Sequence, residues 1–311
     1  MKIHILTFNK PGRPSPVVKT DLDLLKKAAE KQGHEIEIIH APDCQLKFHK
    51  TTEVLIKNKK PEINVLINRP NFLREHIEFR VSLIKQFSLS NIPMLNKYKG
   101  VIRAKNKMRT MQLLAKKNIP IPKTYFVRSA EHLEEITKDI GKFPVIIKTI
   151  AGSHGTGVSL VESERGLKSI VELLVDGGNP APLMIQKYVK ESKGKDIRVF
   201  ILGKRILGAM ERIATKKGEF RSNFHLGGRV GVAELSRKEK DIAFAATEAC
   251  GLDIAGVDIL RTNKGPVVLE VNANPGLEGI TEATGRDIAG EIIKYAVGKA
   301  KRHIRKKENN K

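Results

Sequence analysis

The sequence contains no tryptophan, only four tyrosines and only two cysteines among 311 residues. With so few aromatic side chains, and with no RNP, zinc-finger or helix-turn-helix pattern, sequence-specific reading of nucleic acid is not expected. Cys44 and Cys250 lie in apolar segments without CxxC spacing, which favours buried thiols in a reducing cytoplasm over a disulfide or a zinc site. No apolar run approaches the ~18 residues of a membrane span, and the N-terminus lacks the apolar core of a signal peptide. We therefore expect a cytoplasmic protein without a membrane partner.

Negative charge is scarce relative to positive charge. Lysine and arginine number 57 against 34 aspartates and glutamates, which gives a formal net charge of +23. Residues 299–311 carry seven of these cations and one acid, a net +6 that leaves +17 on the rest of the chain. A basic surface concentrates acidic ligands and accelerates their binding in a salt-dependent way. Nucleic acid, ribosomes and acidic peptides all qualify as partners, although such charge can also serve solubility alone.

The first hundred residues read as an open α/β module. Apolar strands are expected at residues 2–7, 35–39 and 65–70. A helix with apolar residues on one side is expected at about 17–32. This order of elements predicts a sheet that binds ligands at the carboxyl ends of its strands. Arg69 at such an end either reaches a ligand in that crevice or lies on the surface near a turn.

A second module begins near residue 100. A helix is expected from about residue 103 to 117, because the two prolines of Ile119–Pro122 end it, and a new strand begins at Lys123. The lysine-rich end of the chain is expected to fray after about Gly298. The predicted domains are an N-terminal module at 1–100, a central lobe at 101–185, a C-terminal lobe at 186–298 and a basic tail at 299–311.

The most informative segment is a hairpin near the C-terminal end that carries acids. Two apolar strands, 255–260 and 266–269, are joined by a Thr-Asn-Lys-Gly turn. Side chains alternate along a strand, so Glu270 and Asn272 project from one face, where Asp258 of the partner strand can meet them. Three oxygen ligands of this kind suit Mg2+ or Mn2+, which take their remaining ligands from water and nucleotide phosphates. An ordinary hairpin with solvated acids would show the same residues.

A glycine-rich loop precedes this hairpin in the chain. A strand at 143–148 ends in Lys148, residues 151–157 read Ala-Gly-Ser-His-Gly-Thr-Gly, and a second strand follows at 158–161. Small residues let backbone N–H groups approach phosphates, and the lysine supplies positive charge. The loop fits neither a Walker A motif nor a Rossmann fingerprint. A glycine-rich turn alone is more often structural, but its pairing with the acidic hairpin favours nucleotide binding.

The segment between these motifs offers further nucleotide contacts. An apolar strand from Leu183 passes into an extended link whose backbone can meet an adenine edge. Asp196 can accept a hydrogen bond from a ribose hydroxyl. Arg198 and Arg221 can stabilise charge on a transferring phosphoryl group. His225 either binds a ligand or is simply packed or solvated.

Taken in order along nearly the whole chain, these segments resemble the ATP-grasp superfamily and, within it, the RimK-type glutamate ligases. The residues that carry the resemblance are 1–3, 109–115, the strand that ends at Lys148, 196–198, 220–223, 255–261 and 270–280. The resemblance implies an α/β (α+β ATP-grasp) fold, in which an open α/β pre-ATP-grasp domain precedes a two-lobed ATP-grasp fold. Relatives usually have an acid at position 187 and often a serine at position 274, where this chain has lysine and asparagine.

The same resemblance implies roles for the candidate site residues. These roles are contacts to ATP phosphates for Lys107 and Lys148, the adenine hinge for Lys187 and Tyr188, the ribose for Asp196, the nucleotide and reaction centre for Arg221, Ser222 and Asn223, and two Mg2+ or Mn2+ ions for Asp258, Glu270 and Asn272. The expected catalytic set is Arg198, Arg221 and Asn223. ATP and the two metal ions are therefore the expected cofactors.

The implied reaction joins a carboxylate to an amine. The carboxylate attacks the γ-phosphoryl group of ATP to give an acyl phosphate, and the amine of glutamate then displaces phosphate. The implied acceptor is the C-terminal tail of a small-subunit ribosomal protein or a growing oligoglutamate chain. Ribosome contact and a homo-oligomer, by resemblance a tetramer, are further expectations. Two alternatives stay open: a related ATP-grasp ligase acting on lysine-pathway carrier proteins or cofactors, and a non-catalytic ATP-binding regulator.

Overall fold

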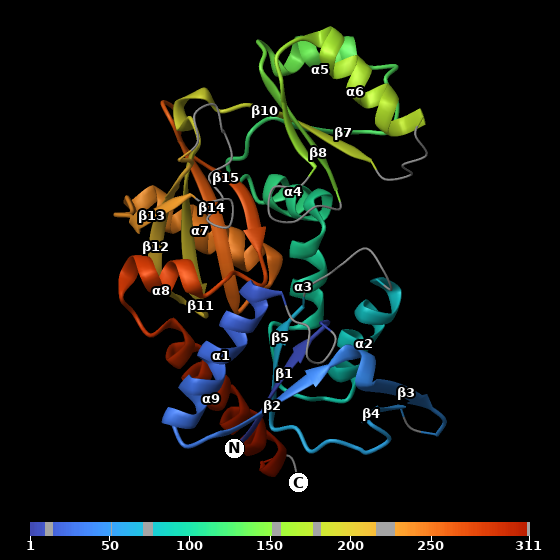
Figure 1. Cartoon of the computed structure of the whole chain (residues 1–311), viewed down its shortest axis with the longest axis vertical. Coiled ribbons are helices and arrows are strands. Elements are labelled where there is room, and N and C mark those ends of the chain that lie inside the picture. The colour runs from blue at the N-terminus through green and yellow to red at the C-terminus, as the bar shows by residue number, and fades with distance from the viewer. Residues whose placement is uncertain are drawn as a thin grey trace.

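The computed structural model describes residues 1–9, 15–50, 52–70, 77–150, 157–176, 182–215 and 228–309. Its three larger sheets occupy three consecutive parts of the chain, and the second part lies at one end of the molecule (Figure 1). The first sheet is parallel and the other two are antiparallel. The expected mixed α/β architecture is therefore confirmed.

The first part of the chain forms a parallel sheet with the strand order β2-β1-β5-β6. Its elements are β1 (Lys2–Thr7), α1 (Pro16–Lys31), β2 (Glu35–His40), the hairpin strands β3 (Cys44–Phe48) and β4 (Thr52–Ile56), β5 (Val65–Arg69), α2 (Ile77–Leu89) and β6 (Met94–Leu95). Every residue of β5 is buried, because apolar clusters cover both faces of this sheet. The three strands and the helix expected in this part are confirmed, within one or two residues at their ends.

The second part of the chain forms a small sheet with the order β7-β10-β8-β9. Its elements are β7 (Thr124–Val127), α5 (Leu133–Ile140), β8 (Val145–Thr149), β9 (Val158–Val161), α6 (Glu164–Asp176) and β10 (Leu183–Lys187). The two helices lie side by side over one face of the sheet, above an aliphatic cluster (Figure 1). Lys148 and Met184 are paired across β8 and β10, and Met184 packs in the cluster of the third part. The face that carries both residues is therefore turned toward the third part.

The third part is an antiparallel sheet with the order β13-β12-β11-β14-β15. Its elements are β11 (Lys195–Leu202), β12 (Arg205–Ile213), β13 (Arg229–Val232), α7 (Arg237–Cys250), β14 (Ile254–Thr262), β15 (Gly265–Asn272) and α8 (Glu278–Thr284). Ile197, Val199 and Ile201 pack in one cluster with Ala243 and Ala246 of α7. Because side chains alternate along a strand, the polar side chains at positions 196 and 198 lie on the face away from α7.

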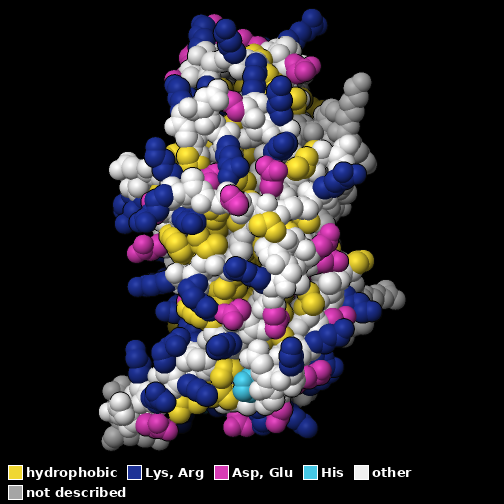
Figure 2. Space-filling view, turned by 90° about the vertical axis from the view of Figure 1, so that its left-hand side faces the viewer, with side chains coloured by type: hydrophobic (Ala, Val, Ile, Leu, Met, Phe, Trp, Pro, Cys, Tyr) yellow, Lys and Arg dark blue, Asp and Glu magenta, His cyan; other side chains and the backbone are white. Residues whose placement is uncertain are grey.

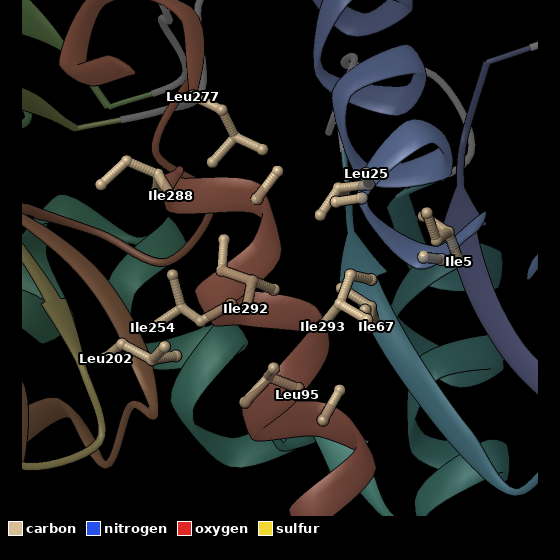
Figure 3. Packing of buried hydrophobic residues seen from close by; sticks show 14 of the residues in the cluster. Ile5, Leu25, Ile67, Leu95, Leu202, Ile254, Leu277, Ile288, Ile292 and Ile293 are labelled. Atoms are coloured by element: carbon tan, nitrogen blue, oxygen red, sulfur yellow. The ribbon is translucent and has the colours of Figure 1, made fainter. Parts of the chain in front are cut away.

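The last helix, α9 (Ile288–Glu308), joins the first and third parts of the fold. Figure 3 shows Ile292 and Ile293 of α9 between Ile5 and Ile67 of the first sheet and Leu202 and Ile254 of the third sheet. The expectation that the chain frays after Gly298 is wrong, because the helix continues to Glu308. Ala300 is fully buried, and the amine of Lys299 pairs with Asp253.

The helix expected at about 103–117 is in fact two helices. α3 (Tyr98–Lys105) ends before Asn106, and α4 (Lys107–Lys116) begins after it. The side chain of Asn106 accepts a hydrogen bond from the backbone N–H of Arg109 at 3.0 Å, which is the preferred role of asparagine at a helix N-cap. The predicted boundary between the central and the C-terminal lobe, at residue 186, falls inside β10. We therefore propose a boundary after Lys187.

The two cysteines are buried free thiols, as expected from their apolar surroundings. Burial raises the pKa of Cys44 to about 12 and that of Cys250 to about 11. Among the helices of the described ranges, none has the length and apolar character needed to cross a membrane.

Candidate active site

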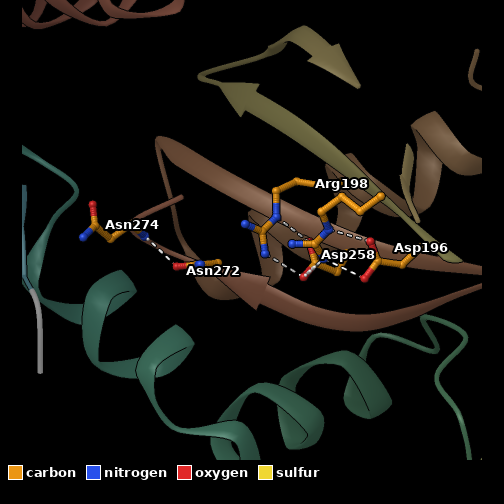
Figure 4. A network of polar contacts seen from close by, with 6 residues as sticks. Asp196, Arg198, Asp258, Asn272 and Asn274 are labelled. Carbon is orange, nitrogen blue, oxygen red and sulfur yellow. Dashed lines mark hydrogen bonds and ion pairs between the residues drawn. The ribbon is translucent and has the colours of Figure 1, made fainter. Parts of the chain in front are cut away.

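A chain of buried ion pairs crosses the face of the third sheet that points away from α7. Arg198 donates from Nε and Nη2 to the two carboxylate oxygens of Asp258, at 2.7 and 2.8 Å. Arg212 donates from Nε and Nη2 to the two oxygens of Asp196, both at 2.6 Å, and its Nη2 also reaches Asp258 at 2.8 Å. The ion pairs therefore follow one another in the order Asp196, Arg212, Asp258, Arg198, with side chains from β11, β12 and β14 (Figure 4). Strand register produces this order, because Asp196 pairs with Arg212 and Arg198 with Asp258.

The network is shielded from water. Arg212 exposes 5%, Asp196 6% and Asp258 3% of their surfaces. Burial lowers the pKa of Arg212, but the carboxylates of Asp258 and Asp196 outweigh that effect and raise the pKa above its usual value. Burial likewise raises the pKa of Asp258, and Arg198 and Arg212 more than reverse this shift. Arg212 and Asp258 are therefore charged at neutral pH, and the hydrogen bonds of the network hold all four side chains in place.

The acidic hairpin places its three oxygen-bearing side chains on this same face. Glu270 of β15 lies directly across from Asp258 of β14, and Asn272 lies across from Gly256, two residues further along. The side-chain oxygen of Asn272 accepts a hydrogen bond from the backbone N–H of Asn274 at 2.9 Å. The expected meeting of Asp258, Glu270 and Asn272 on one face agrees with this register.

The donor set suits a hard metal ion that takes other ligands from a substrate. The carboxylate of Asp258 accepts three hydrogen bonds from the guanidinium groups of Arg198 and Arg212. A carboxylate has roughly four lone-pair positions, so about one remains for a metal ion. Within the described ranges, no group of three or more His, Cys, Asp or Glu side chains forms a metal site. The candidate site consequently has two carboxylates and one amide oxygen, Asn272, which fits Mg2+ with its remaining positions on phosphates and water.

A pocket lies beside Glu270, between the helices α3 and α4, the second sheet and the third sheet. It is lined by Ala104, Lys107, Thr110, Met111, Lys148, Met184, Leu269 and Glu270. The amine of Lys148 donates to the side-chain oxygen of Gln186 at 3.0 Å, and the Gln186 amide donates to the hydroxyl of Thr124 at 2.9 Å. Two lysines and one carboxylate thus line the same pocket, and part-buried hydrogen bonds hold Lys148 in place.

Comparison with known proteins identifies the family. Residues 104–296 match the family described as the RimK-like ATP-grasp domain. The chain belongs to the RimK-like ATP-grasp family. It is 37% identical over 280 residues to a "Probable alpha-L-glutamate ligase" of Shewanella loihica, covering 89% of this chain and 91% of that protein. It is 36% identical over 303 residues to a protein of the same description from Pseudoalteromonas translucida, covering 95% of each.

Solved structures show the same fold. The structure described as ATP-grasp ligase PsnB complexed with minimal precursor, Mg and ADP superposes with a TM-score of 0.72. The match covers 96% of this chain and 97% of that one, at 16% sequence identity. The ATP-grasp fold inferred from the sequence is therefore confirmed, with the acidic hairpin in its third sheet and Lys148 in its second.

Three residues of the RimK-like site have roles that the sequence did not reveal. Arg212 links Asp196 to Asp258, and Gln186 with Thr124 supports Lys148. Arg212 was missed because a two-residue turn at Gly203 and Lys204 predicts Glu211 opposite Asp196. A bulge between Phe200 and Ile201 shifts the register by one residue and brings Arg212 there instead.

Several predicted contacts of this RimK-like chain stay predictions. Both oxygens of Asp196 accept from Arg212, so a ribose hydroxyl would have to share them. The N–H of Lys187 already donates to the carbonyl of Lys123 at 2.9 Å, so an adenine at this hinge needs other backbone groups, such as those of Tyr188. The remaining predicted positions, outside the described residues, are Arg221, Ser222, Asn223, His225 and loop residues 151–156.

Proposed function

We propose that the protein is an ATP-dependent carboxylate–amine ligase that adds glutamate to the C-terminal carboxylate of an acidic acceptor, through an acyl phosphate. One observation carries this proposal. Lys107, Lys148 and Glu270 line one pocket, and Glu270 lies across the strand pair from Asp258, which is paired with Arg198. Cations that bind phosphates and oxygen ligands that bind Mg2+ are thereby gathered at one place. The glutamate ligase description of relatives that match about nine-tenths of the chain supports the same conclusion.

The residues suit a reaction in two steps. An oxygen of the acceptor carboxylate attacks the γ-phosphorus of ATP and ADP leaves; the amine of glutamate then attacks the acyl carbon, loses a proton and expels phosphate. Lys107 and Lys148 would neutralise phosphate charge, and Arg198, fixed by Asp258, would stabilise the phosphoryl group in transfer. Metal ions held by Asp258, Glu270 and Asn272 would supply further positive charge. We propose two such ions, Mg2+ or Mn2+.

Glutamate and an acidic peptide are the proposed partners. The net charge of +23 favours an acidic acceptor, such as an oligoglutamate chain or the tail of a small-subunit ribosomal protein, with ribosome contact in the latter case. A cytoplasmic, tetrameric enzyme completes the proposal. A related ligase for lysine-pathway carriers or cofactors, or a non-catalytic ATP-binding regulator, would keep the same fold.

The test of this function is release of ADP that depends on glutamate. The purified protein is incubated with ATP, Mg2+ and glutamate, together with oligoglutamate, small ribosomal subunits or a carrier protein, and products are identified by mass spectrometry. A ligase forms ADP over many turnovers only when glutamate and the right acceptor are both present, and the acceptor gains the mass of one or more glutamate residues. ATP binding without any glutamate-dependent turnover would instead indicate a regulator.

Lys148 makes nucleotide binding depend on pH. Burial lowers its pKa to about 8, although the Glu270 carboxylate opposes the shift. The amine is charged below this pKa and loses its proton above it, so affinity for ATP should weaken as pH rises from about 7 to about 9. Calorimetric titration across this range checks the prediction. Lys148→Met should bind weakly throughout and lack this pH dependence; an unchanged dependence in that variant would place the titrating group elsewhere.

Positive charge is distributed over the protein surface. Figure 2 shows Lys and Arg side chains over the whole visible face, with Asp and Glu scattered among them. Raising salt from about 50 to about 200 mM should therefore raise the acceptor KM steeply and the ATP KM much less, because exposed charges are screened within a Debye length. Equal salt effects on both KM values would contradict electrostatic recruitment of the acceptor.

The end of α9 allows the contribution of the basic tail to be separated. Deleting residues 299–311 would remove the buried Ala300, so glutamine substitution of the exposed Lys301, Arg305 and Lys306 is the better variant. This end lies far from α4 and β8 (Figure 1), so we expect a larger effect on a ribosomal acceptor than on a free peptide. The matched control, with equal loss of charge, replaces the exposed lysines 19, 27 and 31 of α1. Equal effects of the two triple variants would assign the recruitment to overall charge.

A further inference from the structure

The first part of the fold grips the acidic hairpin through one buried side chain, Asn96. Its amide nitrogen donates to the carbonyls of Ile254 at 2.7 Å and Ala273 at 2.9 Å. Its amide oxygen accepts from the backbone N–H groups of Asp253 and Ile254, both at 2.7 Å. Ile254 begins the strand that carries Asp258, and Ala273 follows Asn272 directly. One side chain thus ties together the two ends of the hairpin where the candidate metal ligands lie.

A second grip acts on the loop that follows the hairpin. Arg69 donates from Nη1 to the carbonyl of Pro275 at 3.0 Å, and its Nη2 pairs with the carboxylate of Asp21. Asp21 in turn accepts from the backbone N–H of Leu277 at 2.8 Å. Arg69 exposes only 4% of its surface. The Arg69 side chain thus lies between the first part and the loop after the hairpin. It is neither at the surface nor directed at a ligand, which were the two alternatives drawn from the sequence.

The loop that contains Pro275 lies beside the ion-pair network. A Cβ added at Gly256 would lie 2.8 Å from the Cβ of Pro275 and 3.5 Å from the Cδ of Arg198. Pro275 and the stem of Arg198 therefore pack against the same point of β14, and only glycine leaves room for both. Pro275, whose carbonyl is bonded to Arg69, therefore lies over the same glycine as the arginine that holds Asp258.

We propose that Asn96 and Arg69 are positioning residues, which fix Asn272 and Asp258 in the geometry that binds metal. The inference rests on the proposed function only in taking these two residues as metal ligands. Backbone groups of a loop can occupy several positions, and four hydrogen bonds from a rigid side chain select one of them. The first part of the fold consequently acts on the reaction centre through the backbone of the hairpin and of the loop that follows it.

The test measures metal binding separately from turnover. Mn2+ is titrated into the protein with a non-hydrolysable ATP analogue and followed by electron paramagnetic resonance, and Mg2+ dependence of ligation is measured in parallel. Asn96→Ala and Arg69→Met should weaken Mn2+ binding about 10-fold or more, as loss of outer-sphere support does at metal sites. Arg69→Lys, which keeps a cation beside Asp21 but not the forked donor, should fall between wild type and Arg69→Met and guards against failure of Arg69→Met to fold.

The matched control is Gln32→Ala. Gln32 also bonds across the interface, from its amide to the carbonyl of Gly290 at 3.0 Å, but contacts α9 rather than the hairpin. It should change thermal stability with metal binding unaltered. If Asn96→Ala, Arg69→Met and Arg69→Lys all bind Mn2+ like wild type, the residues only stabilise the interface and the inference is overturned. A wild-type protein that binds Mn2+ with the analogue, yet never ligates glutamate, would instead refute the proposed function.

Discussion

Glu270→Gln is expected to lower kcat for glutamate ligation by about 100- to 1000-fold, the effect of removing one preorganised electrostatic group from a reaction centre. Glu270 is partly buried and lines the pocket beside Lys107 and Lys148. Glutamine has nearly the same shape, so the substitution removes the charge and leaves the packing. Steady-state kinetics at saturating Mg2+ and unchanged thermal unfolding together check the result.

Glu248→Gln is the control for this variant, because Glu248 is exposed on α7, which covers the opposite face of the sheet. It should retain full activity. Near-normal turnover of Glu270→Gln at saturating Mg2+ would remove Glu270 from the metal site and leave the hairpin a structural element.

Arg212→Met is expected to destabilise the fold by about 3–5 kcal/mol, because it leaves Asp196 and Asp258 buried without their shared partner. Methionine fills most of the same volume, so the loss reports charge rather than a cavity. Urea unfolding measures it. Arg205→Met on the same strand is the control, since the ion pair of Arg205 with Glu291 at 2.6 Å is exposed and should contribute less than about 1 kcal/mol.

The deficit of Arg212→Met should depend on pH with a defined sign. In the wild type, Arg198 and Arg212 hold the pKa of Asp258 below its usual range, so the carboxylate stabilises the fold at neutral pH and loses that contribution as pH falls through the folded pKa. Without Arg212 the carboxylate of Asp258 takes up a proton more readily. The difference in unfolding free energy between wild type and variant should therefore shrink toward acid pH; a difference that stays constant would show that packing, not charge, is lost.

The acidic hairpin shows what the sequence could predict and what it could not. Two apolar runs and a turn were enough to place β14 and β15. The alternation that puts Glu270 and Asn272 on one face is also local. Their meeting with Asp258, however, needs the bulge between Asp258 and Ile259, because regular pairing from the turn would set Glu270 opposite Val257. A bulge depends on the packing of the whole sheet, and no residue type at this position predicts it.

Other features could not be predicted from local sequence segments, because they join parts of the chain that are far apart in sequence. Asn96 and Arg69 act on backbone groups more than 150 residues away in sequence, at separations of 158 and 206 residues. The end of α9, after Gly298, was predicted to be a frayed tail because it is rich in lysine and arginine. Its buried side, which includes Ala300, is completed only by packing on the first sheet. Long-range contacts of this kind leave no period in the sequence.

Oxygen transfer from the acceptor tests the central claim most directly. The acceptor is prepared with its terminal carboxylate labelled with oxygen-18 and incubated with the protein, ATP, Mg2+ and glutamate, and the released phosphate is analysed by mass spectrometry. If the carboxylate is activated as an acyl phosphate, the amine of glutamate expels phosphate that carries one labelled oxygen for each amide formed. Unlabelled phosphate, released while ADP accumulates, would mean that water rather than the carboxylate attacks ATP, and would contradict the ligase reaction proposed for this site.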